Sequence, residues 1–250
     1  MFPLRDDNPT LQKSVITFLI VCINIVVWVF VQGLGTEPAL IQSVYSYGLI
    51  PGELLQTMKP GTSVRISPTL IYIIEENPNW FSLLSHMFLH GGWFHIIGNM
   101  WFLTVFGDNV EDSMGQVRFI IFYLLCGLIA ASIQILFNPS SPVPMVGASG
   151  AISGIMGAYM ILYPKAPVHL LIFFGFFIER VIVPAYFMMA YWFVLQLIGA
   201  LPSTGAQDGG VAFWAHVGGF IAGVILIPIF KKNDRVEAQK RLYLRRMSGF

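Results

Sequence analysis

Six apolar runs, the second and fourth of them short, constrain the fold of this 250-residue chain more than any other feature. A helix needs about 20 residues, most of them apolar, to cross the roughly 30 Å hydrocarbon core of a bilayer. The runs cover residues 15–31, 93–106, 119–137, 151–162, 183–201 and 211–230. Only 11% of the residues are charged, whereas a soluble domain has about a quarter. The sequence therefore predicts an all-α membrane protein, a bundle of six transmembrane helices over residues 15–230.

The distribution of basic residues predicts how the bundle is oriented. Half of all the Lys and Arg residues follow the last apolar run, within residues 231–250. Because basic flanking segments stay on the cytoplasmic side, we expect this tail in the cytoplasm, and six spans place the short segment 1–14 there too. The longest connection, about residues 33–92, is then external. The basic tail is interpreted as a solvated helix that orients the protein in the lipid bilayer, and no nucleic acid is expected as a partner.

Polar residues interrupt three of the apolar runs at a similar depth. His95 and Asn99 lie near the start of the second run, Ser149 directly precedes the fourth, and His216 lies near the start of the sixth. Even-numbered spans all run from outside to inside in this topology, so these side chains converge in the outer half of the membrane. Polar groups at membrane depth are costly and usually functional.

Ser149 and His216 have the chemistry of a nucleophile and its base. A serine hydroxyl becomes nucleophilic when a base within about 2.6–3.2 Å removes its proton. Small residues at four-residue spacing let two helices approach that closely. Such pairs are Gly150 and Gly154 in the fourth run and Gly219 and Gly223 in the sixth. No carboxylate is expected at this depth, so the sequence predicts a Ser-His dyad rather than a triad.

Four residues are candidates for binding the carbonyl of a substrate. The negative charge that develops on that oxygen needs preorganised donors. His95 and Asn99 are four residues apart and share a helix face. The Ser149 N–H lies at a helix N-terminus, which favours anions, and we add Gly147 from the same segment. Singly, each polar residue has a structural explanation, such as a hydrogen bond between helices; their common depth favours catalysis.

These residues stand in stretches that resemble the rhomboid family of intramembrane serine proteases, from about residue 88 to residue 228. The stretches are His90-Gly-Gly-Trp-Phe-His95-Ile-Ile-Gly-Asn99, Gly107-Asp-Asn-Val-Glu111, Gly147-Ala-Ser149-Gly150 and Ala215-His216-Val-Gly-Gly219-Phe-Ile-Ala-Gly223. The resemblance implies that Ser149 attacks and that His216 acts as general base and then as general acid. It also assigns His95 and Asn99, with the Ser149 N–H, to the oxyanion site.

The resemblance implies supporting residues as well. His86 and His90 would organise the first loop, and Glu111 would bond backbone in the turn after the second span. Many family members place an aromatic residue four positions after the nucleophile, where it packs on the catalytic histidine. This chain has Ser153 there, which could offer His216 a hydrogen bond instead.

The function implied is that of a serine endopeptidase that cleaves single-span membrane proteins near the outer end of their transmembrane helix. No metal or cofactor is expected, the sequence predicts no particular oligomeric state, and a bacterial plasma (inner) membrane is the expected location.

Three alternatives stay open at this point. His86, His90 and His95 could bind zinc in a metal hydrolase, although the Glu of a His-Glu-x-x-His motif is absent. The chain could be a non-catalytic rhomboid-like protein that binds transmembrane helices, although it keeps both Ser149 and His216. A transporter is the third alternative, but transporters usually place charges near the midplane, whereas these polar groups cluster near one face.

Overall fold

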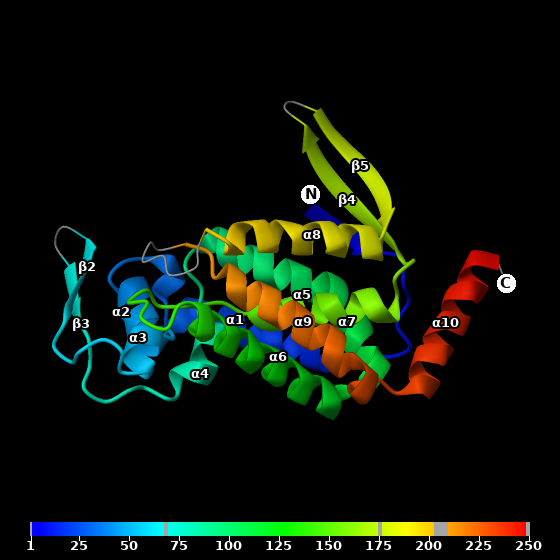
Figure 1. Ribbon diagram of the computed structural model, residues 1–250. Helices are drawn as coiled ribbons and strands as arrows, with labels where there is room; N and C mark the ends of the chain where they lie inside the picture. The colour runs from blue at the N-terminus through cyan, green and yellow to red at the C-terminus, as the bar shows by residue number, and fades with distance from the viewer. Residues whose placement is uncertain (1, 68–69, 175–176, 203–209, 249–250) are drawn as a thin grey trace.

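The computed structural model describes residues 2–67, 70–174, 177–202 and 210–248, and a helix occupies each of the six apolar runs. These helices are α1 (Val15–Phe30), α5 (Trp93–Met114), α6 (Gln116–Phe137), α7 (Ser149–Leu162), α8 (Ala185–Ala200) and α9 (Phe213–Phe230). They lie side by side in one elongated bundle (Figure 1). Within the described ranges, α6 and α9 are long and apolar enough to cross a membrane, and α1, α7 and α8 are shorter apolar helices.

Helix α7 forms the centre of the bundle because its residues are apolar or small on every side. Most of them are buried, and the helix packs on α5, α6, α8 and α9. Its most extensive contact is with α9. A Cβ added at Gly219 would overlap the carbonyl of Gly150, and one added at Gly223 would overlap that of Gly154. The two glycine faces therefore meet, and the backbones of α7 and α9 touch.

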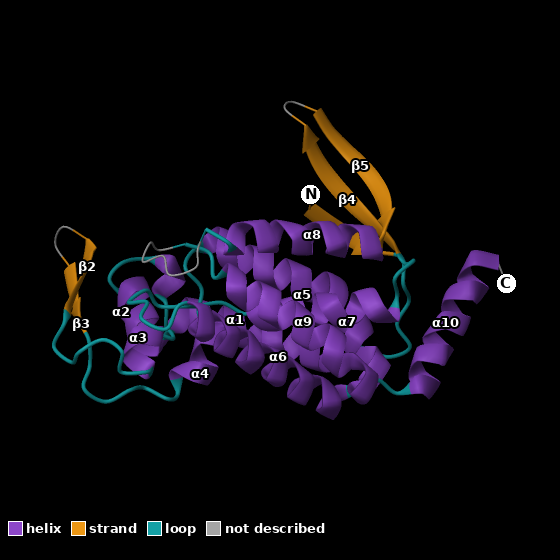
Figure 2. Cartoon of the chain, viewed as in Figure 1, coloured by secondary structure: helices purple, strands orange, loops and turns teal. Residues whose placement is uncertain are grey.

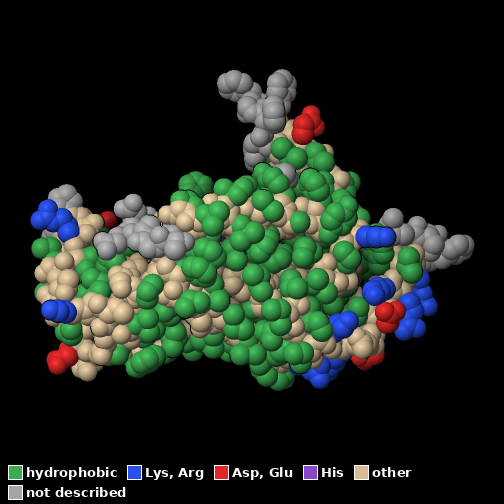
Figure 3. All heavy atoms as spheres, in the orientation of Figure 1, with side chains coloured by type: hydrophobic (Ala, Val, Ile, Leu, Met, Phe, Trp, Pro, Cys, Tyr) green, Lys and Arg blue, Asp and Glu red, His purple; other side chains and the backbone are tan. Residues whose placement is uncertain are grey.

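The lateral surface of the bundle is apolar. Large apolar side chains lie exposed on several helices; Phe94 is 94% exposed, Val117 72% and Ile229 72%. In Figure 3, hydrophobic side chains cover the middle of the bundle, while Lys, Arg, Asp and Glu gather mainly at its two ends. Apolar surface of this extent is expected where the surroundings are lipid rather than water.

The connection between α1 and α5 has secondary structure of its own at one end of the bundle (Figure 1). Its elements are η1 (Gly33–Gly35), α2 (Ala39–Tyr47), α3 (Pro51–Leu54), β2 (Ser63–Ser67), β3 (Leu70–Ile73), α4 (Ser82–Ser85) and η2 (His86–Phe88). Strands β2 and β3 form an antiparallel pair. The backbones of Leu49 and Met145 also pair, which ties this connection to the segment that precedes α7.

The all-α prediction is wrong in one respect, because a second, three-stranded sheet is present. Strands β1 (Phe2–Asp6), β4 (Pro167–Phe174) and β5 (Phe177–Pro184) are antiparallel, in the order β1-β4-β5. Val168 pairs with Val183, and β-branched residues favour such pairing. The fifth helix therefore begins at Ala185 instead of at residue 183. The β4–β5 hairpin projects from the bundle near α8 (Figure 2).

The basic tail forms helix α10 (Asn233–Ser248), and one face of it is docked on the bundle. Gln239 is fully buried; it accepts a hydrogen bond from Tyr163 and donates one to the Asn109 carbonyl at 3.3 Å. An Arg235 nitrogen lies 3.7 Å from an Asp112 carboxylate oxygen. The prediction of a solvated helix is therefore wrong for this face, because its partners are distant in sequence.

Candidate active site

Ser149 and His216 form a hydrogen-bonded pair between two helices. Ser149 is the first residue of α7, and His216 lies in the first turn of α9. The Ser149 Oγ lies 2.8 Å from the His216 Nε2, a distance at which the hydroxyl can donate to the ring nitrogen. His216 is buried. The pair has the geometry that proton transfer from serine to histidine requires.

Contacts of α7 with its neighbours explain why the two side chains come so close. Gly150 packs on Ala130 of α6, since a Cβ at this glycine would lie 2.7 Å from the Ala130 Cβ. The close contact of α7 with α9 continues from Gly150 to Gly154. The backbone N–H of Ala215 also donates to the Oε1 of Gln134 on α6 at 3.1 Å, which fixes the start of α9. Ser149 and His216 are thus placed by packing on both sides of α7.

Gly147 lies beside both the His95 ring and the Ser149 hydroxyl. The φ of Gly147 is +128°, a conformation that favours glycine. A Cβ here would lie 2.7 Å from the His95 Nε2 and 3.4 Å from the Ser149 Oγ. The Nδ1 of His95 accepts a hydrogen bond from the Gly91 N–H at 3.2 Å. A neutral ring therefore carries its proton on Nε2, the nitrogen that faces Gly147.

Asn99 contributes a buried donor on the same helix as His95. Its side chain is 7% exposed, and its Nδ2 has no acceptor among the residues that the structure describes. Leaving a buried donor unpaired costs about 1–3 kcal/mol. Such a donor calls for an explanation, and a ligand that brings its own acceptor is one.

Gln196 was missed by the sequence reasoning and holds the other side of the His216 ring. The Nδ1 of His216 lies 2.8 Å from the Oε1 of Gln196 on α8. Trp192, one turn earlier on α8, lies tilted against the His216 ring, with a centroid distance of 5.8 Å. Gln196 is a lone amide in an apolar run, and the rule that polar groups at membrane depth need a reason would have identified it.

Ser153 does not fill the role that the sequence suggested for it. Its hydroxyl donates to the Ser149 carbonyl at 2.6 Å, within its own helix. This is the usual behaviour of a serine inside a helix. Ser153 therefore does not bond His216 as the sequence suggested. The side-chain oxygen of Gln196 bonds the ring instead.

His86 holds the segment before α5 in place, and Gln32 fixes the backbone of His90. The His86 ring bonds the Ser82 carbonyl at 2.8 Å, and the His86 carbonyl accepts the Gly147 N–H at 2.8 Å. The Gln32 side chain donates a hydrogen bond to the His90 carbonyl and accepts one from the His90 N–H, both at 2.8 Å. Burial lowers the pKa of His86 to about 4 and that of His90 to about 3, so both rings are neutral at pH 7.

The zinc alternative requires His86, His90 and His95 to surround one point. Across the described ranges, no group of three or more His, Cys, Asp or Glu side chains is placed to hold a metal ion. The His86 ring is turned to a backbone carbonyl, and the His90 and His95 rings meet edge to face at 5.2 Å. This geometry does not favour a three-histidine metal site.

Glu111 lies far from the Ser149–His216 pair and caps a helix. At 1.5 Å per residue, it is about 24 Å along α5 from His95. Its carboxylate accepts the backbone N–H groups of Ile16 and Thr17 at 3.0 and 2.8 Å, and the Thr17 hydroxyl at 2.8 Å. It therefore bonds backbone, but in the first turn of α1 rather than in the turn after α5.

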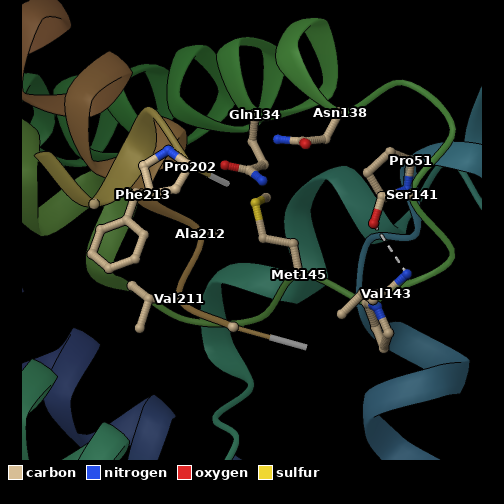
Figure 4. A pocket seen from close by; sticks show the side chains of 13 residues that line it. Pro51, Gln134, Asn138, Ser141, Val143, Met145, Pro202, Val211, Ala212 and Phe213 are labelled. Atoms are coloured by element: carbon tan, nitrogen blue, oxygen red, sulfur yellow. Dashed lines mark hydrogen bonds between the residues drawn. The ribbon is translucent and has the colours of Figure 1, made fainter. Parts of the chain in front are cut away.

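A cavity of about 310 Å³ lies between the end of α6, the segment before α7 and the start of α9, and neither Ser149 nor His216 lines it. Figure 4 shows Gln134 and Met145 pointing into it, with Ala212 and Phe213 along one side. Ala212 stands four residues before His216, and Met145 four residues before Ser149. The cavity thus borders both segments that carry the pair.

The fold and the site together define a helical bundle with an apolar belt and a Ser–His pair held where two helices touch. A family model described as a Rhomboid domain matches residues 77–233, more than half of the chain. The chain therefore belongs to the rhomboid family, whose members are embedded in membranes and include serine intramembrane proteases.

Individual relatives come from plants and bacteria. The chain is 29% identical over 169 residues to Rhomboid-like protein 11, chloroplastic, of Arabidopsis thaliana, over 65% of this chain and 56% of that protein. It is 29% identical over 157 residues to RHOMBOID-like protein 6, mitochondrial, of the same plant, over 62% and 44%. It is 31% identical over 136 residues to Rhomboid protease GluP of Bacillus subtilis (strain 168), over 50% and 26%. The match spans about half the length of the first relative, and the plant names do not single out a bacterial membrane.

Proposed function

We propose that this protein is an intramembrane serine endopeptidase in which Ser149 is the nucleophile and His216 the base. The observation that carries the proposal is the 2.8 Å distance between the Ser149 Oγ and the His216 Nε2 inside a rhomboid bundle. A serine in a helix does not need such a partner for structural reasons, whereas a nucleophilic serine does.

The His216 Nε2 carries a proton in each half of the reaction. As the Ser149 Oγ attacks a peptide carbonyl, the His216 Nε2 takes the hydroxyl proton. The same nitrogen gives that proton to the leaving amine, which frees the C-terminal product and leaves an acyl-serine. A water molecule then attacks the ester carbon as His216 takes one of its protons, and His216 returns that proton to the Ser149 Oγ as the bond to the acyl group breaks. No metal or cofactor takes part.

Three donors stabilise the negative charge of the tetrahedral intermediate. They are the Nε2–H of His95, the Nδ2 of Asn99 and the backbone N–H of Ser149. The His95 proton is directed to the side of Gly147 by the bond from Gly91. Asn99 is buried without an acceptor in the described structure, so an oxyanion would satisfy it. The absence of a side chain at Gly147 leaves room for the carbonyl beside Ser149.

The substrates are single-span membrane proteins, cut near the outer end of their transmembrane helix. The six helices span the bilayer with both termini in the cytoplasm, so the first turns of α7 and α9 lie in the outer half of the membrane. The cavity of about 310 Å³ supplies space for water at that end. An extended segment is needed there, because the carbonyls of a helix are already hydrogen-bonded. The membrane of residence is proposed to be a bacterial plasma membrane.

The second candidate is a non-catalytic rhomboid-like protein that only binds transmembrane helices. Such a protein has no need to keep an activated serine. The contact between Ser149 and His216 and the unpaired Asn99 donor favour the enzyme.

The test is whether Ser149 reacts as a catalytic serine. We expect the purified protein to be labelled by a fluorophosphonate at Ser149 alone, as mapped by mass spectrometry, and to cleave a single-span substrate in detergent. The Ser149→Ala variant should show neither reaction, and a chelator should change neither. Absence of labelling in the folded wild-type protein would refute the proposal and favour the non-catalytic candidate.

Removing the Asn99 donor is expected to lower kcat by up to about 10²–10³-fold with little change in KM, because the donor acts on the transition state. The measurement is the rate of cleavage by Asn99→Ala as a function of substrate concentration. Asn24→Ala is a matched control: Asn24 is also buried, but its amide donates to the Ile20 carbonyl of its own helix at 2.8 Å. Equal rates for Asn99→Ala and Asn24→Ala would remove Asn99 from the oxyanion site.

A further inference from the structure

The hydrogen bond of Gln196 fixes one side of the His216 ring. The Gln196 Oε1 lies 2.8 Å from the His216 Nδ1, and the Gln196 Nε2 lies 3.4 Å from the Trp192 carbonyl. An amide nitrogen donates and an amide oxygen accepts. With the nitrogen turned to a carbonyl, the oxygen faces the ring, and the ring must supply the proton.

This bond selects one tautomer of the neutral imidazole. When Nδ1–H donates to Gln196, the lone pair is on Nε2, where it accepts the Ser149 hydroxyl at 2.8 Å. The other tautomer would set the Nδ1 lone pair against the Gln196 oxygen and give Nε2 a proton that it cannot remove from Ser149. Only the first tautomer is a base toward Ser149.

The same bond is kept while the proton moves. After His216 takes the Ser149 proton, Nδ1–H still donates to Gln196, now from a positively charged ring. Hydrogen bonds from a charged donor are stronger than those from a neutral one. The contact therefore favours the protonated ring of the intermediate over the resting ring, although less strongly than a carboxylate would.

We propose that Gln196 is the positioning residue of this active site, a neutral counterpart of the acid in a Ser-His-Asp triad. The proposal rests on the proposed function. Gln196 does not touch the reacting atoms; it acts through His216. Trp192 lies on the same helix, so α8 orients the base by both a hydrogen bond and a ring contact of 5.8 Å. Ser153, on the helix that carries the nucleophile, does not support the ring in this way, since its hydroxyl bonds its own backbone.

The alternative is that Gln196 only satisfies a buried histidine and stabilises the fold. The two roles differ in the pH dependence of the reaction. A structural role would change the amount of folded protein and leave the pH profile of the folded fraction unchanged. A positioning role predicts that the chemistry of residue 196 alters kcat and its pH dependence.

The experiment compares Gln196→Met with Gln196→Glu in the full-length protein. Methionine keeps the length of the side chain and removes the acceptor, so we expect kcat to fall by about 10-fold or more, with KM little changed. Glutamate restores an acceptor and should recover most of kcat. It should also move the acid limb of the pH–rate profile to higher pH, because a carboxylate favours the protonated imidazole.

The neighbouring variant Leu195→Met is the matched control, because Leu195 is 43% exposed on the same helix. It should leave kcat and the pH profile unchanged. If Gln196→Met fails to show a thermal unfolding transition, the pH profile of Gln196→Glu decides alone.

Two outcomes would overturn the inference. One is a folded Gln196→Met with kcat and pH profile within about twofold of the wild type, and the other is a Gln196→Glu profile that does not shift. Both leave the wild type active and the proposed function intact. Failure of the proposed function looks different, because the wild type would then neither cleave substrate nor label at Ser149.

Discussion

Replacing His216 with alanine is expected to lower the rate of substrate cleavage by about 10³-fold or more. Among the described contacts of the Ser149 hydroxyl, the base within hydrogen-bonding distance is the His216 imidazole. Without that ring, no described neighbour can take the hydroxyl proton. The measurement is the initial rate of cleavage of a single-span substrate in proteoliposomes. Ser149→Ala should lose a similar factor, and the double variant should be no slower than either single variant, because the two residues act as one unit.

His169→Ala is the control for this prediction. His169 lies on β4, where its Nε2 is 2.8 Å from an Asp7 carboxylate oxygen, and it has no part in the proposed site. The same substitution there should leave the rate unchanged. A His216→Ala variant that keeps more than about a tenth of the wild-type rate would mean that another base serves Ser149.

The positions of the helices followed from the sequence because apolar runs and helices share one cause, the burial of side chains in lipid or in the core. The ends of the helices did not follow. Helix α5 continues to Met114, eight residues beyond the predicted end of the second run at residue 106. Most of those residues are polar, and they are buried by contacts from the N-terminal part of the chain, such as that of Asn8 with Asn109 and of Thr17 with Glu111. A local sequence pattern cannot predict contacts with partners about a hundred residues away.

The three-stranded sheet was missed for a related reason. Residues 167–184 are apolar and rich in β-branched and aromatic side chains, so they resemble both a strand and the edge of a membrane span. The apolar pattern places the end of this segment, from residue 183, in the fifth helix. The partner strand β1 lies at the other end of the sequence, and only its pairing with β4 distinguishes the two possibilities.

The candidate site was partly predictable. Ser149, His216, His95 and Asn99 were found from their common depth in even-numbered runs, and the structure brings Ser149, His216 and His95 around Gly147. Gln196 escaped because it lies in the fifth run. In the predicted topology that run ascends, so a residue near its C-terminal end is also expected in the outer half of the membrane. A common depth in all six runs, rather than in the even-numbered ones alone, predicts Gln196 as well.

The close approach of α7 and α9 gives a second large effect, on stability as well as on activity. Gly223→Ala is expected to destabilise the folded protein by about 1–3 kcal/mol, because the added Cβ overlaps the Gly154 carbonyl and the two backbones must separate. Activity should fall in the same variant, since the contact between these helices also sets the distance from Ser149 to His216. Beyond about 3.5 Å, that hydrogen bond is lost.

Gly98→Ala distinguishes this packing effect from the ordinary effect of alanine in a helix. Gly98 lies within α5, and a Cβ there meets no atom within 4 Å. Alanine inside a helix is about 0.5–1 kcal/mol more favourable than glycine, so Gly98→Ala should be neutral or stabilising, opposite in sign to Gly223→Ala. The measurements are the midpoint of thermal unfolding in detergent and the rate of fluorophosphonate labelling. If Gly223→Ala matches Gly98→Ala in both measurements, the glycine contact does not position the catalytic pair. The short distance between Ser149 and His216 then has another cause.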